Sequence, residues 1–483
     1  MNPFALDHKF YDILQQAASK VKSWIEADEI IRLSSHIDAD GLSAAGIICS
    51  ALSRLKASFH LRILRQLDPE FIEELVKEDR NCYIFSDFGS GQIKHLAKSL
   101  PSKDIIILDH HEPLNISKPS NILEINPILF GIDGSNEVSG SGVSFLFAYA
   151  LDPKKNIDLL PLALVGALGD TQDKEKQHSL TGLNAKIAEF GVQQNLLKIE
   201  KDLYFQYREM KPIHHALMET TDPFLPGLTG NEEACVRFLS SINIPLQAGE
   251  KWRTISDLST EEKKRLTTQL SQLILSHGGT SKQASNLVST TYILTTETDP
   301  YLKDAREFAE LLNACGRTRH PGIGVAVCMG DRDIHYRRAQ DLLTDYQKKI
   351  NSFLETLKHP GSIHETDYLQ YFFGGDELEE TMIGTIATIA VKTKLTKKVL
   401  IGFAKSNNQC YKISARAPQQ FVDKGVHLGL ALRQTIAQLK LDPSKFLAGG
   451  HDAAAGTRIP ITYEKSFIET LNKVLHQQII KKD

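Results

Sequence analysis

The chain has 483 residues, of which 41% are hydrophobic, so it is long enough to bury the cores of roughly two or three domains. Its 56 lysines and arginines nearly balance its 59 aspartates and glutamates, so the overall charge does not by itself indicate a nucleic-acid partner. No apolar stretch could cross a bilayer, no signal-peptide core is present and six cysteines lack paired spacing; we expect a soluble cytoplasmic protein with reduced thiols and no membrane association.

Short apolar segments in the first part of the chain predict buried strands. They lie at about 30–35, 60–64, 81–86, 104–109 and 121–125, with helical patterns in the intervals. This alternation is typical of a doubly wound parallel sheet, and it predicts an α/β fold.

Four apolar segments of the amino-terminal half end at acids or histidines. The carboxyl ends of strands in open α/β sheets are the usual ligand sites, so we expect these side chains to meet at one edge. Several carboxylates brought together repel one another unless cations lie among them, and the pattern therefore predicts metal. For a single acid such as Asp87 or Asp170, a helix cap or a turn is the alternative. The four endings are His36-Ile37-Asp38-Ala39-Asp40-Gly41, Asp87, Asp109-His110-His111 and Asp170.

The ligand types indicate which metal to expect. Oxygen ligands alone suit magnesium or calcium, whereas the addition of His36 and His110 favours manganese or another transition ion. We therefore predict Mn²⁺, with Mg²⁺ as the alternative. Six side chains exceed the needs of one ion that also keeps positions for water and substrate. Two ions roughly 3.5–4 Å apart would use them all, and such a centre hydrolyses phosphoesters.

The middle of the chain gives weaker signals. Residues 198–209 look helical and charged, as in a connector, and 260–277 shows a helical period. A further helix is expected over 304–317, and Gly316 fits its end. Arg317 either reaches a substrate phosphate or satisfies the last carbonyls of that helix.

The carboxy-terminal half contains a basic stretch. From Val391 to Lys445 there are eleven lysines and arginines against two acids, Asp423 and Asp442. Such a stretch can attract a polyanion even in a nearly neutral protein. For the lysines between 392 and 398, an ordinary solvated surface is the alternative.

Two candidate phosphate-binding elements lie in or near this stretch. Strands are expected at about 398–404 and 410–416, and alternation along the second puts Ser414 and Arg416 on one face, where the arginine could donate two hydrogen bonds to a phosphate. Further on, two glycines before His451 let the backbone lie close to a ligand; a plain glycine turn is the alternative. These glycines are Gly449 and Gly450.

Taken together, the motifs resemble those of the DHH phosphoesterase superfamily. The four acid and histidine endings resemble its four catalytic motifs in order. Ser414-Ala415-Arg416 and Gly449-Gly450-His451-Asp452-Ala453-Ala454-Ala455-Gly456 look like the two signatures of its accessory substrate domain. With Asn313-Ala314-Cys315-Gly316-Arg317, the chain is most similar to the archaeal RecJ-like exonucleases, a group that includes a GINS-associated nuclease.

The resemblance implies four segments and a set of site residues. A DHH catalytic domain is expected over 1–192, a helical connector over 193–220, an inserted, mainly helical module over 221–300 and a smaller α/β accessory substrate-binding domain over 301–483. His36 and Asp38 would hold one ion, Asp40, His110 and Asp170 the other, and Asp87 would bridge them. His36 is alternatively a support for a ligand, because its spacing departs from the His-x-x-x-Asp-x-Asp of smaller members. Asp109 would orient a histidine, and the substrate would contact His111, Arg317, Ser414, Arg416, Gly449, Gly450 and His451.

The function implied by the resemblance is a two-metal exonuclease specific for single strands. We expect 5′ to 3′ cleavage of single-stranded DNA in replication or repair, with RNA as a further substrate and GINS and the replicative helicase complex as partners. One alternative is a scaffold that binds GINS with weak or no nuclease activity. Another is a hydrolase of small phosphoesters or short oligonucleotides, including 3′ to 5′ action on RNA.

Overall fold

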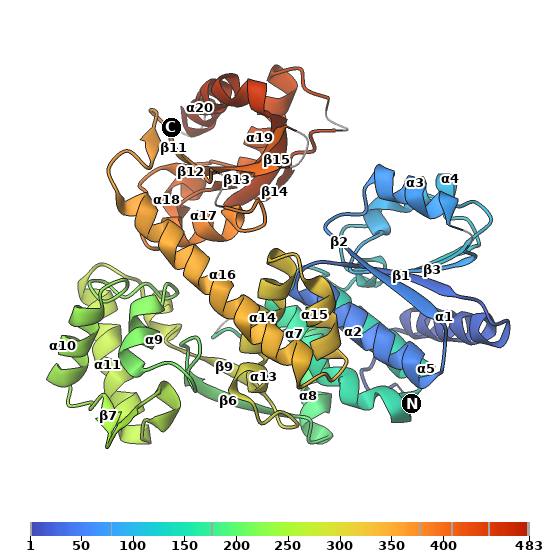
Figure 1. Cartoon of the computed structure of the whole chain (residues 1–483), viewed down its shortest axis with the longest axis horizontal. Helices are drawn as coiled ribbons and strands as arrows, with labels where there is room; N and C mark the ends of the chain where they lie inside the picture. The colour runs from blue at the N-terminus through green and yellow to red at the C-terminus, as the bar shows by residue number, and fades with distance from the viewer. Residues whose placement is uncertain are drawn as a thin grey trace. The chain divides into compact units, whose positions relative to one another are not determined.

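The computed structural model describes residues 2–78, 80–174, 177–375, 378–406, 409–442 and 445–480 (Figure 1). Packing divides the chain into two compact units. Unit 1 comprises Met1–Leu217 and Glu232–Leu343, and unit 2 comprises Met218–Asn231 and Thr344–Asp483. Each unit is built around its own main sheet.

Unit 1 contains a parallel sheet of five strands in the order β2-β1-β3-β4-β5. The strands predicted from the sequence are confirmed, and so is the doubly wound α/β class. The chain passes from β1 to β2 on one side and then to β3 on the other, and ligands bind such sheets at the strand ends beside this reversal. The strands are β1 (Ile31–His36), β2 (Phe59–Leu64), β3 (Cys82–Ser86), β4 (Asp104–Leu108) and β5 (Ile122–Ile125).

Helices lie on both faces of this sheet (Figure 1). On one face, Phe71 and Leu96 pack with Phe85 of the sheet in a buried cluster. On the other, α2 begins with small, fully buried residues, which lets α5 and α7 pack closely against it. The helices are α1 (His8–Glu26), α2 (Ala39–Arg54), α3 (Pro69–Lys77), α4 (Ile93–Ser99), α5 (Gly140–Leu151), α6 (Pro153–Asn156), α7 (Leu160–Gly169) and α8 (Gly182–Gln193).

Three later helices also contribute to unit 1. The helix predicted over 304–317 is confirmed as α14 (Ala305–Arg317), which packs on α7, and α15 (Pro321–Cys328) packs on α2. The boundary between the units falls within α16 (Ile334–Lys358). Residues 301–343 thus lie in unit 1, and the four-segment division drawn from the sequence stays a prediction.

The prediction of a helix over 198–209 is wrong, because this segment begins as a strand. β6 (Leu197–Leu203) pairs antiparallel with β9 (Val288–Leu294). The lysines of β6 are exposed and its acids half-buried, and the distant β9 completes its hydrogen bonds. Between them lie α9 (Ile213–Glu219), α10 (Glu232–Ser241), β7 (Gln247–Ala248), β8 (Lys251–Trp252), α11 (Thr260–Ser276) and α12 (Ser281–Ser285), followed by α13 (Pro300–Lys303). The helix predicted over 260–277 is confirmed as α11.

Unit 2 contains a sheet of six strands in the order β10-β11-β12-β13-β15-β14. The predicted pair of strands is confirmed, because β12 and β13 are antiparallel neighbours. Phe403 and Ile413 share a core with Leu432 of α19 and Leu471 of α20. The elements are β10 (His364–Glu365), β11 (Leu369–Phe373), α17 (Ile383–Lys392), β12 (Val399–Ser406), β13 (Cys410–Arg416), α18 (Gln419–Asp423), α19 (Leu428–Gln438), β14 (Gly449–Gly450), β15 (Ala454–Pro460) and α20 (Glu464–Ile480).

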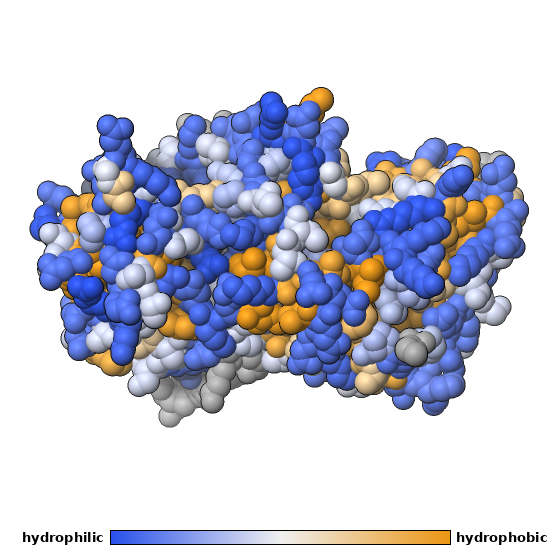
Figure 2. Space-filling view, turned by 90° about the horizontal axis from the view of Figure 1, so that it is seen from below, coloured by the Kyte–Doolittle hydropathy of each residue, from blue (hydrophilic) through white to orange (hydrophobic). Residues whose placement is uncertain are grey.

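Polar residues predominate on the face of the molecule drawn in Figure 2, where hydrophilic residues surround smaller hydrophobic patches. Large hydrophobic side chains that are well exposed include Ile334 and Leu447. Among the helices that the structure describes, none combines the length and the apolar composition needed to span a bilayer.

Candidate metal centre

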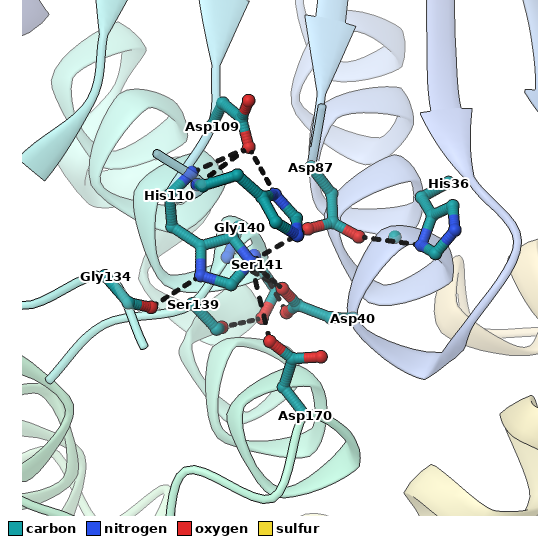
Figure 3. Close-up of polar contacts among 12 residues, drawn as sticks. His36, Asp40, Asp87, Asp109, His110, Gly134, Ser139, Gly140, Ser141 and Asp170 are labelled. Carbon is teal, nitrogen blue, oxygen red and sulfur yellow. Dashed lines mark hydrogen bonds and ion pairs between the residues drawn. The ribbon is translucent and has the colours of Figure 1, made fainter. Parts of the chain in front are cut away.

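The predicted ligands meet at the carboxyl edge of the unit 1 sheet (Figure 3). His36 ends β1, Asp87 follows β3, and His110 follows β4 shortly after its last residue. The first turn of α2 adds Asp38 and Asp40, and Asp170 follows α7. Three strand ends and two helix ends therefore supply the six side chains expected from the sequence.

One group of ligands consists of His36, Asp38 and Asp87. The Nδ1 atom of His36 lies 2.9 Å from Oδ2 of Asp38 and 3.4 Å from Oδ2 of Asp87. Asp38 caps α2, because its Oδ1 accepts a hydrogen bond from the backbone N–H of Gly41. Its second oxygen stays directed toward His36.

The other group surrounds the Nε2 atom of His110. This nitrogen lies 3.7 Å from Oδ2 of Asp40, 3.2 Å from Oδ1 of Asp87 and 3.5 Å from Oδ2 of Asp170. The Nδ1 atom of His110 lies 2.6 Å from the carbonyl oxygen of Gly134, so Nδ1 carries a proton donated to that oxygen. The lone pair of neutral His110 is then on Nε2, where it faces the three carboxylates.

Asp87 joins the two groups. One of its carboxylate oxygens faces His110 and the other faces His36. Its backbone lies in the left-handed region, with φ of 60°. Gly140 approaches so closely that a Cβ there would lie 2.7 Å from Oδ1 of Asp87. Only a glycine therefore leaves room for this carboxylate.

The amino terminus of α5 holds the carboxylate of Asp40 in place. The backbone N–H of Gly140 donates to Oδ2 of Asp40 at 2.7 Å, and that of Ser141 donates to Oδ1 at 3.0 Å. A Cβ at Gly166 would lie 2.2 Å from Oδ1. The carboxylate is completely buried, and its position is fixed from two sides.

The electrostatics show a crowded negative site. Burial, together with the neighbouring Asp87 and Asp170, raises the pKa of Asp40 well above its usual value, and burial raises the pKa of Asp170 to about 6. Burial opposes a charge on His110, yet Asp87 and Asp170 raise its pKa well above the usual value. The raised pKa values of Asp40 and Asp170 reflect crowded negative charge, which a bound divalent ion would offset.

Two buried polar atoms test whether ions fit here. Oδ1 of Asp87 and Nε2 of His110 lie 3.2 Å apart, and neither has a hydrogen bond of good geometry within the described part of the chain. Neighbouring ligands of an octahedral ion with bonds of about 2.1 Å lie about 3 Å apart, close to the spacings of both groups. The donors are oxygens and imidazole nitrogens, a set that suits Mn²⁺ or Mg²⁺. The residues fit a centre of two ions that shares Asp87.

His111 lies at the exposed rim of this centre. Its Nδ1 is 2.8 Å from Oδ1 of Asp109, and 58% of its side chain is exposed. The buried Asp109 also accepts hydrogen bonds from the backbone N–H groups of Ser90, His110 and His111. Although burial opposes the charged imidazole, Asp109 raises the pKa of His111. The prediction that Asp109 orients a histidine matches this contact.

The sequence did not predict the residues that hold the candidate ligands in place. The amides of Gly140 and Ser141 bind Asp40, and a helix start rich in small residues after Ser139 is the signal that could have indicated an anion-binding amino terminus. Asn313 accepts a hydrogen bond from the backbone N–H of Ala39, between the two acids of α2. Arg317 is the last residue of the same helix, α14.

The remaining predicted substrate residues belong to unit 2. Arg416 donates to the hydroxyls of Thr388 at 2.8 Å and Ser414 at 3.1 Å, and Ser414 is buried. Gly449 and Gly450 form the exposed strand β14. His451 follows it, exposed, with its backbone N–H bonded to the carbonyl oxygen of Ala454.

Comparisons with known proteins agree with this architecture. Residues 30–167 match the N-terminal domain of the DHH family, residues 205–288 the DHH-CID domain and residues 366–477 the DHHA1 domain. The uncharacterized protein MJ0831 of Methanocaldococcus jannaschii is 31% identical over 93% of this chain and 94% of its own length. The single-stranded-DNA-specific exonuclease RecJ of Bacillus subtilis is 28% identical over 34% of this chain and 22% of its own length.

Two solved structures share the fold. RecJ from Thermus thermophilus, crystallised with Mn²⁺, superposes with a TM-score of 0.58 at 17% identity, over 96% of this chain and 55% of that one. CDC45 from Entamoeba histolytica superposes with a TM-score of 0.64 at 14% identity, over 96% of this chain and 99% of that one. The motifs, the three matched domains and the relative that matches along nearly its whole length agree. They show that the chain belongs to the DHH superfamily as a RecJ-like protein.

Proposed function

We propose that the chain is a metal-dependent exonuclease that removes nucleotides from an end of a single-stranded nucleic acid. The observation that carries the proposal is Asp87, whose two oxygens face two separate sets of ligands. A shared carboxylate between two ion sites is the arrangement used for hydrolysis at phosphorus. The DHH family match and the exonuclease relative support this reaction class.

Each side chain has a distinct role in this proposal. Two divalent ions, when bound, supply an acidic water and neutralise charge on the phosphate. Asp87 would bridge them, with His36 and Asp38 on one side and Asp40, His110 and Asp170 on the other. His111, held by Asp109 through Nδ1, would donate a hydrogen bond from its Nε2 to a phosphate oxygen.

The proposal extends to the identity of the ion, the substrate and the direction of cleavage. We infer Mn²⁺ as the ion, with Mg²⁺ as the alternative, and 5′ to 3′ action on single-stranded DNA in replication or repair, with RNA as a further substrate. Arg317, Ser414, Arg416, Gly449, Gly450 and His451 would contact the strand. The six cysteines are free thiols, which fits the cytoplasm, where disulfides rarely persist.

A second candidate is a replication scaffold. The fold shared with CDC45 favours it, and GINS with the replicative helicase complex would be its partners. Against a scaffold that has lost catalysis, all six expected ligands are present and converge. We therefore rank cleavage first and treat partner binding as an accompanying role.

The test compares the wild type with Asp87→Ala and a matched control. Asp333→Ala removes an aspartate of the same unit that is 73% exposed and pairs only with Arg337 among the residues described. Purified proteins are incubated with Mn²⁺ and with single-stranded DNA and RNA of several lengths, labelled at the 5′ or the 3′ end. We expect wild type and Asp333→Ala to shorten long strands and Asp87→Ala to be slower by several orders of magnitude.

Other outcomes would redirect or overturn the proposal. The position of the label released first reports the polarity of cleavage. Hydrolysis of dinucleotides or pyrophosphate alone would favour a small-phosphoester hydrolase, including one acting on short RNA. Retention of GINS without any cleavage would favour the scaffold. Near-normal cleavage by Asp87→Ala would contradict the role of this carboxylate.

A further inference from the structure

A second cluster of metal-ligating side chains lies in the part of unit 1 between β6 and β9. His214 and His215 are near the start of α9, and Glu232 is the first residue of α10. One ligand atom from each residue lies within 4.8 Å of the others. None of these residues belongs to the centre at the sheet edge.

The geometry of the cluster converges on one point. The Nε2 atoms of both imidazoles approach the same carboxylate oxygen, Oε1 of Glu232, at 3.5 Å for His214 and 3.2 Å for His215. The ligands of a tetrahedral zinc ion, with bonds of about 2.0–2.1 Å, lie about 3.3 Å from one another. The two spacings to Oε1 of Glu232 are therefore close to two edges of such a coordination shell.

The two histidines differ in their surroundings. His214 is only 5% exposed, and its ring packs against Trp252, with ring centroids 5.1 Å apart. Its Nδ1 is buried without a hydrogen bond to the described residues, so Nε2 is the nitrogen that meets another polar group.

We propose that His214, His215 and Glu232 bind one divalent transition-metal ion of the Zn²⁺ class. Two imidazoles and one carboxylate form a known zinc donor set that leaves a fourth position for water or another ligand. His215 and Glu232 are partly exposed, so this position is open to solvent.

The place of the cluster in the chain indicates what the ion does. Unit 1 is interrupted between Leu217 and Glu232, and the intervening segment Met218–Asn231 packs with unit 2. The histidines lie just before this segment and the glutamate directly after it. The ion therefore joins the two ends of the segment and fixes α9 against α10.

Counting bound ions tests the proposal on the full-length protein. Metal-free wild type, His215→Ala, Glu232→Gln and the control His277→Ala are dialysed to equilibrium against Zn²⁺. His277 is an exposed histidine that also lies between β6 and β9, outside the cluster. Both cluster variants are expected to bind one ion fewer per chain than wild type and His277→Ala. Equal numbers for all four proteins would overturn the proposal.

Cobalt provides an independent readout of geometry. Four-coordinate Co²⁺ absorbs visible light much more strongly than six-coordinate Co²⁺, so the intense bands report this site separately from an octahedral centre. We expect these bands in wild type and His277→Ala and their loss in His215→Ala and in Glu232→Gln. Glu232→Gln preserves the shape of the side chain, which separates loss of a ligand from misfolding. Identical spectra in wild type and Glu232→Gln would contradict the site.

Discussion

Asn313 accepts a hydrogen bond from the backbone N–H of Ala39 at 3.2 Å, and this contact joins α14 to the first turn of α2. Ala39 lies between Asp38 and Asp40, one acid from each ligand group. Gly316, one turn later, packs so close that a Cβ there would lie 2.0 Å from the carbonyl oxygen of Ile37. α14 thus positions both acids without contributing a ligand itself.

Asn313→Ala should therefore weaken ion binding while the fold is retained. The substitution leaves a buried N–H without its acceptor and loosens the turn that carries both acids. We expect Mn²⁺ to bind about 10–100-fold more weakly, the range seen when a support of a metal ligand is lost. Titration calorimetry measures this. Thr318→Ala is the control, because it removes a hydroxyl bonded to Ala314 within the same helix end. Unchanged affinity in Asn313→Ala would contradict the supporting role.

Gly166→Ala should disrupt the centre through a steric clash. The added Cβ would lie 2.2 Å from Oδ1 of Asp40 and 2.0 Å from Oγ of Ser141. We expect a destabilisation of about 1–3 kcal/mol and a loss of Mn²⁺ affinity. Gly322→Ala on α15 is the matched control, because a Cβ there meets nothing within 4 Å. Denaturant unfolding with and without Mn²⁺ compares the two. Equal behaviour of both variants would argue against tight packing around Asp40.

The stability of the protein should fall as the pH rises through neutrality because of Glu307. Burial and the nearby Asp304 raise the pKa of this carboxyl to about 8. Between the unfolded pKa of about 4.3 and the folded value, the folded state keeps a proton that the unfolded state loses, so stability declines over that window. The side chain of the Glu307→Gln variant stays neutral, so its free energy of unfolding should decline less with pH than that of the wild type. The difference is on the order of a few kcal/mol at most. Urea unfolding across the window measures it.

A control variant distinguishes the contribution of Glu307 to the pH dependence of stability from the loss of any other negative charge. Glu261→Gln changes an exposed glutamate of α11 and should leave the pH dependence of unfolding as in the wild type. If Glu307→Gln and the wild type lose stability in parallel, Glu307 does not carry the proton.

Arg416→Ala should reduce the salt dependence of single-strand binding. A contact between one arginine and one phosphate contributes about −0.7 to the slope of log affinity against log salt for single strands. Arg416 also donates to Thr388 and Ser414, so the variant needs a check of its unfolding midpoint. Fluorescence anisotropy over a salt series measures the slope, with Lys473→Ala, an exposed lysine of α20, as the control. Equal slopes for Arg416→Ala and the control would remove Arg416 from the binding surface.

The sheet and the meeting of acids and histidines at its edge could be predicted from the sequence because both depend on local signals. Buried strands such as β4 are continuous apolar runs, and their polar ends mark the site, as at His110. Pairing between distant segments has no such signal. β6 has the composition of an exposed helix, and only its partner β9 makes it a strand.

The residues that hold the candidate ligands in place could not be predicted from local sequence either. The fit of Gly166 under Asp40 depends on the packing of α7 against α2 and α5, which no single stretch of sequence specifies. The hydrogen bond from Ala39 to Asn313 joins two segments that are far apart in the chain. Polar residues at strand ends can thus be recognised in the sequence, whereas the contacts that orient their side chains depend on the folded structure.

The most direct measurement is anomalous diffraction from a crystal soaked in Mn²⁺. We expect two manganese peaks roughly 3.5–4 Å apart, one on each side of the Asp87 carboxylate. His36 and Asp38 should bind one ion, and Asp40, His110 and Asp170 the other. A single peak, or manganese bound away from Asp87, would contradict a centre of two ions bridged by this residue.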